Sequence, residues 1–186
     1  MRAAISSLDP HFSPEWTATT PAIEVSNANP SRSRLLFPYS GSPTADAALD
    51  VAADWAHALC ADAWVLYVRT WDTSRGGHFY IETRAEASAL AQVAVSRLRL
   101  RGVTASRVVR DADRARLADA ILVEAEALDA RLIVLGTRAR GVLGAALVGS
   151  TSMAVARRAS RPVILVKGIS TSAGRRRFHR QRPPSS

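Results

Sequence analysis

The chain has 186 residues, of which 47% are hydrophobic and 22% are charged, a composition typical of one globular domain with flanking tails. No stretch approaches the roughly 18 consecutive apolar residues of a membrane-spanning helix, and the first residues lack the apolar run of a secretory signal. The one cysteine, Cys60, excludes an internal disulfide bond. We therefore expect a cytoplasmic protein that does not associate with membranes, in which Cys60 is an inert packing residue.

The net charge of +9 is distributed unevenly along the chain. Residues 1–33 carry two arginines and three acidic residues, whereas residues 168–186 carry five arginines and no acidic residue. Neither segment has the composition to bury enough apolar surface to fold alone. We therefore expect a disordered N-terminal extension over 1–33, one domain over 34–167 and a disordered basic tail over 168–186. Contact of that tail with nucleic acid is one hypothesis, but a solvated tail is the simpler interpretation.

The domain is expected to begin with a short apolar strand, "RLLFPY" at 34–39, followed by the turn residues "SGSP". A helix is expected from Thr44, because small and aliphatic residues recur at helical spacing opposite an acidic stripe. The nearly continuous apolar run at 63–70 predicts a buried second strand.

Helices and strands continue to alternate after a loop expected around Gly76 and Gly77. The last helix is expected to start at Ser150, before the final strand. The other expected elements are a helix from about Arg84 to Arg101, a strand at 103–109, a helix marked by Ala118, Ile121, Leu122, Ala125 and Leu128, and strands at 131–136 and 161–167.

This alternation predicts an α/β fold, a doubly wound, five-stranded, Rossmann-like parallel sheet. The expected strand order is 3-2-1-4-5, with the chain reversing direction between the first and fourth strands. Ligands of such sheets bind at the carboxyl ends of the strands, beside this reversal. The loops "PYSGSP" at 38–43 and "GTRARGVLG" at 136–144 are therefore expected to flank one crevice.

Two stretches, "LLFPYSGSPTADAALDVAADWA" and "RLIVLGTRARGVLGAALVGSTSMAVARRASRPVILVK", resemble the universal stress protein domain, and the order of elements agrees over about 34–167. The resemblance implies an adenine nucleotide alpha hydrolase-like fold, a role in stress response, and a homodimer paired through the last strand. Family members that bind ATP carry G-x2-G-x9-G-[S/T] after strand four. This chain matches at Gly136, Gly149 and Ser150. It departs at Ala139, and Ser40 stands where the family commonly has an aspartate.

The same resemblance implies that ATP or AMP, with or without Mg, occupies the crevice. Its phosphates are expected near Gly136, where main chain can approach a ligand, and at the last helix, which Ser150 is expected to N-cap. Unpaired amides and the helix dipole there favour an anion, and Val68 and Leu135 are expected to line an adenine pocket. The full set of expected nucleotide contacts is Pro38, Ser40, Val68, Leu135, Gly136, Arg138, Ala139, Gly149, Ser150, Thr151 and Ser152.

The two departures from the family motif predict weakened binding. The methyl group of Ala139 costs about 1–2 kcal/mol if that residue needs a positive φ. The hydroxyl of Ser40 can hydrogen-bond, but it lacks the charge of a carboxylate.

No catalytic or metal-binding pattern is present, because the four histidines and Cys60 lack partners at suitable spacing and no Walker loop occurs. An efficient enzyme is therefore not expected, although slow ATP hydrolysis stays open. Three functions remain as hypotheses: a nucleotide-binding stress-response module that regulates an unknown protein partner, a nucleotide-free dimeric scaffold in which the glycines serve only a tight turn, and a domain tethered to nucleic acid by its basic tail.

Overall fold

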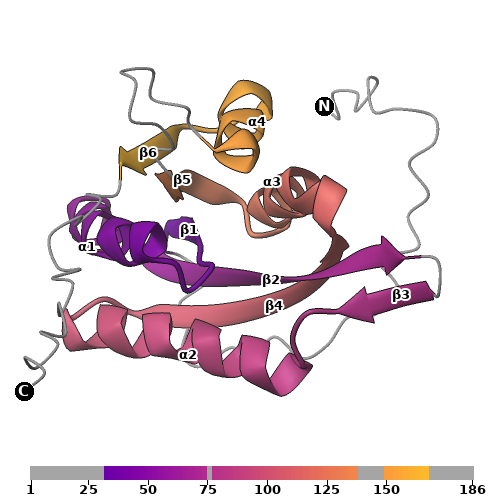
Figure 1. Cartoon of the computed structure of the whole chain (residues 1–186). Helices are drawn as coiled ribbons and strands as arrows, with labels where there is room; N and C mark the ends of the chain where they lie inside the picture. Colours follow the sequence, from indigo (N-terminus) through magenta and orange to yellow (C-terminus); the bar gives the residue numbers. More distant parts are fainter. Residues whose placement is uncertain (1–31, 75–76, 138–148, 168–186) are drawn as a thin grey trace, which may run out of the picture.

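The structure is a computed structural model that describes residues 32–74, 77–137 and 149–167 (Figure 1). Of the two expected tails, residues 1–31 and 168–186 lie outside these ranges. No helix in the described ranges is long and apolar enough to cross a membrane. The elements are β1 (Arg34–Pro38), α1 (Pro43–Ala58), β2 (Asp62–Ser74), β3 (Gly77–Tyr80), α2 (Arg84–Leu100), β4 (Ala105–Asp113), a 3-10 turn (Arg114–Arg116), α3 (Leu117–Ala127), β5 (Ala130–Thr137), α4 (Ser150–Arg158) and β6 (Val163–Lys167).

Five strands form a parallel sheet in the order β4-β2-β1-β5-β6. The expected order, 3-2-1-4-5, is therefore confirmed. The direction in which successive strands are added to the sheet reverses between β1 and β5, which are neighbours in the sheet. α1 and α2 cover one face, and α3 and α4 cover the other (Figure 1).

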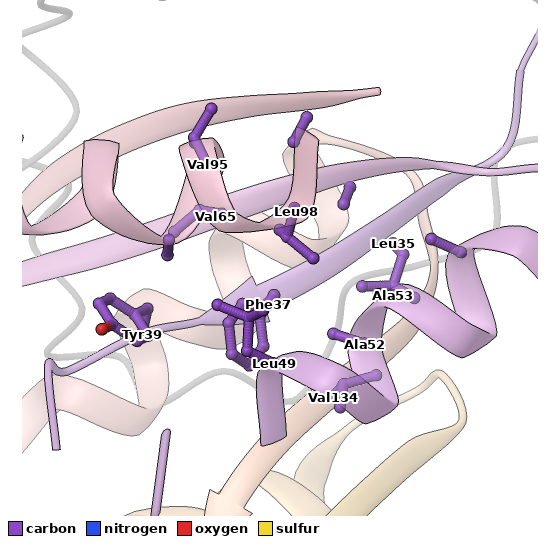
Figure 2. Close-up of a cluster of buried hydrophobic side chains, with 14 of the residues drawn as sticks. Leu35, Phe37, Tyr39, Leu49, Ala52, Ala53, Val65, Val95, Leu98 and Val134 are labelled. Carbon is purple, nitrogen blue, oxygen red and sulfur yellow. The ribbon is translucent and has the colours of Figure 1, made fainter. Parts of the chain in front are cut away.

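The larger apolar cluster lies between the sheet and the helices α1 and α2. Figure 2 shows side chains from β1, β2, β5 and both helices gathered in it. α1 contributes mainly small residues, and such side chains let a helix backbone approach a sheet closely. Its buried positions are Ala45, Ala48, Leu49, Ala52, Ala53 and Ala56.

The loop expected around Gly76 and Gly77 is corrected at Gly77, which begins β3, and Gly76 lies outside the described residues. β2 continues to Ser74, and β3 runs back antiparallel to it, so a hairpin extends from the parallel sheet. β4 is also longer than expected and pairs with β2 as far as Asp113.

Side-chain pairs hold this extension together. Arg69 donates to both carboxylate oxygens of Asp111 on β4, at 2.8 and 2.7 Å. The Arg69 guanidinium also lies 3.7 Å from the centroid of the Tyr80 ring, which Trp71 contacts edge-on. Because charged and polar residues follow the apolar run here, an apolar pattern alone ends the strand too early.

Cys60 is not a packing residue, which corrects the expectation from the sequence. It is exposed and has a φ of 47°, in the left-handed region, directly after α1. Its N–H donates to the carbonyl of His57, and the N–H of Ala61 donates to that of Ala56. These bonds terminate the helix, a role that glycine usually fills. Gly102 occupies the matching position after α2, with a φ of 79°.

Arg32 and Ser33, the two residues before the expected start of the domain at residue 34, contact the folded domain. The Asp62 side chain is only 4% exposed, and its carboxylate lies 3.1 Å from the Arg32 guanidinium. The N–H of Asp62 donates to the carbonyl of Ser33 at 2.8 Å. A chain that begins at residue 34 would therefore leave a buried carboxylate without its partner.

We expect a chain of residues 32–167 to keep the cooperative thermal transition of the full chain. A chain of residues 34–167 should lose about 1–3 kcal/mol of unfolding free energy, the usual cost of a buried charged group left unpaired. Urea denaturation of the three chains measures this difference. Equal stability of the two shortened chains would show that the Arg32 contact is dispensable, and loss of cooperativity in the longer one would contradict the domain boundary.

Candidate functional site

Gly136 near the end of β5 is the point at which three elements meet. A Cβ atom at this position would lie 2.4 Å from the carbonyl oxygen of Thr44 and 3.0 Å from the nitrogen of Ala45, both in the first turn of α1. The carbonyl of Gly136 accepts a hydrogen bond of 3.2 Å from the hydroxyl of Ser152, in the first turn of α4. The N-terminal turns of two helices therefore converge on the carboxyl end of β5.

This convergence makes the site favourable for an anion. Each helix N-terminus carries unpaired N–H groups and the positive end of the helix dipole. At α4, no described side chain accepts a hydrogen bond from these groups. A Cβ atom at Gly149 would meet no atom of the described residues within 4 Å. Such a terminus can hold a phosphate without a specialised side chain.

Ser150 is not the N-cap of α4, which corrects the expectation by one residue. Gly149 is the N-cap, with φ −52° and ψ 142°, and Ser150 is the first helical residue with an exposed side chain. Glycine costs only a few tenths of a kcal/mol at an N-cap relative to serine. The helix can therefore begin there while its first amides stay uncapped by a side chain.

Ser40 lies at the start of a short chain of hydroxyl groups after β1. Its hydroxyl oxygen is 3.0 Å from that of Ser42, which in turn is 3.0 Å from that of Thr44. Ser42 caps α1 by accepting the N–H of Ala45 at 3.3 Å. Ser40 is the exposed end of this chain of hydroxyl groups and is a neutral group.

Tyr39 anchors this loop, a role that the sequence analysis missed. Its N–H donates to the carbonyl of Leu66 at 2.8 Å, which continues the pairing of β1 with β2. Its hydroxyl donates at 2.8 Å to Asp46, a carboxylate that Arg97 also binds, at 2.5 Å. Burial, followed by the hydrogen bond to Asp46, raises the pKa of Tyr39 above its ordinary value. The phenol therefore stays protonated and keeps this donor role.

Val68 and Leu135 both lie on the sheet face that α3 and α4 cover. Leu135 is buried near the end of β5. Val68 is not at a strand end as expected, because β2 continues into the hairpin. β1, however, stops at Pro38 opposite Leu66, so Val68 lies just beyond the carboxyl end of β1.

Arg138 and Ala139 lie outside the described residues, together with the rest of 138–148. Thr151 is half-buried in the first turn of α4. Within the described ranges, no group of three His, Cys, Asp or Glu side chains is arranged to hold a metal ion.

The fold is shared with solved structures. A universal stress protein from Archaeoglobus fulgidus is 26% identical to the chain with a TM-score of 0.61, and the match covers 73% of this chain and 98% of that one. A universal stress protein in complex with cAMP is 21% identical with a TM-score of 0.58, covering 74% and 98%. A universal stress protein from Archaeoglobus fulgidus in complex with dAMP is 23% identical with a TM-score of 0.52, covering 73% and 98%. No curated protein gives a significant match.

A family model described as the universal stress protein family matches residues 31–167. The match runs from one residue before the first described residue to Lys167, the last residue of β6. It therefore includes every described strand and helix, and both glycines at the helix convergence. The chain belongs to the universal stress protein family.

Proposed function

We propose that the protein binds an adenine nucleotide, ATP or AMP, at the convergence of α1 and α4, and that its occupancy regulates a protein partner during stress. The observation that carries this proposal is the meeting of two helix N-termini at Gly136. An anion there interacts with two helix dipoles at once. The proposed role is binding rather than catalysis.

The comparisons support an adenine nucleotide as the ligand, because the cAMP and dAMP complexes share this fold. Whether Mg accompanies the nucleotide depends on its phosphates, because the described residues offer no metal cluster of their own.

Affinity is expected to be lower than in family members with a complete motif. Ser40 supplies a neutral hydroxyl at the crevice where the family motif commonly has a carboxylate. Ala139, which lies outside the described residues, adds a methyl group where the family motif has a glycine. Together the two departures reduce affinity without removing the helix termini that attract phosphate.

We further propose that the protein acts as a cytoplasmic homodimer paired through β6. This strand pairs with β5 along one edge, and four consecutive apolar residues, Val163 to Val166, are each only half-buried. An apolar edge strand of this kind favours pairing with another strand.

A nucleotide-free scaffold is the second candidate, and the packing of Gly136 favours it. A glycine is needed there for the approach of α1 whether or not a ligand binds. The experiments below separate the two functions. The basic tail, and with it the nucleic-acid hypothesis, lies outside the described residues.

Gly136 and Gly149 separate the requirements of folding from those of binding. Gly136→Ala should lower the free energy of unfolding by about 1–3 kcal/mol, because the new methyl group overlaps α1 backbone. Gly149→Ser should change it by only a few tenths of a kcal/mol, because a Cβ atom there meets no described residue within 4 Å and serine is a preferred N-cap. Urea unfolding measures both variants, and equal destabilisation would contradict the described packing.

Calorimetric titration with ATP tests the nucleotide proposal. The Ser40→Asp, Ala139→Gly double variant should bind roughly tens to hundreds of fold more tightly than the parent, because each change restores on the order of 1–2 kcal/mol. Gly149→Ser should weaken ATP binding, because the new hydroxyl accepts a hydrogen bond from a backbone N–H that would otherwise bind phosphate. The bulkier Gly149→Val should abolish ATP binding. If neither the parent nor the double variant binds millimolar ATP, the scaffold function replaces this one.

Sedimentation at micromolar concentration tests the dimer, and we expect two copies per particle. The N–H of Ile133 donates to the carbonyl of Pro162, so the backbone groups of Leu165 point away from β5 by strand alternation. Leu165→Pro should therefore yield a folded monomer, because it removes an outward donor and leaves the β5 ladder intact. A monomeric parent protein would contradict the homodimer proposal.

A further inference from the structure

A cavity of about 270 Å³ lies at the opposite end of the sheet from the proposed nucleotide site. It is bordered by the amino ends of β1 and β5, the residues after α3 and the turn before β6. The five-residue strand β1 separates the two ends of the sheet by about 13 Å at 3.3 Å per residue. Four arginines line the cavity: Arg32, Arg34, Arg131 and Arg161.

Two of these arginines have no carboxylate partner among the described residues. Arg34 donates to the backbone carbonyl of Leu128 at 3.0 Å. Arg131 makes a long contact of 3.4 Å with the hydroxyl of Ser33. Both acceptors are neutral, so neither cancels the charge of a guanidinium.

The other two arginines are paired with carboxylates, so the positive charge of the cavity comes from Arg34 and Arg131. Arg32 pairs with Asp62 at 3.1 Å, and Arg161 lies 3.0 Å from Asp129 and also binds Glu126. Asp129 is the one carboxylate among the residues that line the cavity, and its side chain is 87% exposed. The Nε of Arg161 is buried and has no hydrogen-bond partner in the described part of the chain.

Arg34 and Arg131 border the same cavity without a carboxylate partner in the described residues, and their like charges repel unless an anion lies between them. Guanidinium groups present paired N–H donors that match the oxygens of a phosphoryl group. The volume is smaller than the ~300–1,000 Å³ of most pockets for drug-sized ligands, which fits a compact anion better than a whole nucleotide.

We propose that this cavity binds a small phosphoryl anion, independently of the adenine nucleotide at the other end of the sheet. The arginines of β1 and β5, Arg34 and Arg131, supply the charge that no carboxylate of the described residues neutralises. None of the residues that line the cavity belongs to the expected nucleotide contacts.

Calorimetric titration of the full chain with pyrophosphate tests the site. The Arg34→Gln, Arg131→Gln double variant should bind pyrophosphate at least about tenfold more weakly than the parent. The matched control is Arg114→Gln with Arg158→Gln, which removes the same charge from exposed arginines that pair with Asp72 and Asp119. This control should bind like the parent, and the basic tail is common to all the proteins.

A second variant keeps all four arginines in case their loss disturbs the fold. Ser33→Asp adds a carboxylate to the cavity lining and should also weaken pyrophosphate binding at least tenfold, while ATP affinity and the melting temperature stay at parent values. The proposal is overturned if the parent shows no binding at millimolar pyrophosphate. It is also overturned if the control variant loses as much affinity for pyrophosphate as the Arg34→Gln, Arg131→Gln variant. A third contrary result is that Gly149→Ser removes pyrophosphate binding while Ser33→Asp leaves it unchanged.

Discussion

The close packing of β5 against the first turn of α1 is the constraint on which the functional end of the molecule depends. A methyl group at Gly136 would lie 2.4 Å from the carbonyl oxygen of Thr44, so α1 can occupy its place only if this residue is glycine. The carbonyl of the same residue holds α4 from the other side of the sheet through Ser152. One small residue thus brings two helix N-termini, which approach from opposite faces, to one edge.

The sheet order followed from the sequence because buried parallel strands are nearly continuous in apolar residues, and right-handed crossovers leave few alternatives. The β2–β3 hairpin did not, because Arg69 and Asp111 interrupt the apolar pattern while forming the pair that extends the strands. At the candidate site, Gly136 and Gly149 could be located by their match to the family motif. The capping by Gly149 rather than Ser150, and the anchoring by Tyr39, depend on backbone angles and distant contacts that no local pattern records.

The two ends of the sheet offer different chemistry for anions. At the carboxyl end, the attraction comes from backbone amides and helix dipoles, which remain when one polar side chain such as Ser40 is exchanged. At the amino end, it comes from arginine side chains, which can be neutralised one at a time. The core between them is built largely from alanine, valine and leucine, and it separates the ends by the length of β1. Binding at one end can therefore be altered by substitution without changing groups at the other.

Amide chemical-shift changes on addition of ATP test the nucleotide site most directly, because they report which backbone N–H groups meet the ligand. The largest shifts should fall on Gly136, on residues 149–152 at the start of α4 and on residues 40–42 before α1. The amides of Ser33, Arg34 and Arg131, at the other end of the sheet, should not move. Shifts confined to that other end, or no shifts at millimolar ATP, would contradict the proposal that the converging helix termini bind an adenine nucleotide.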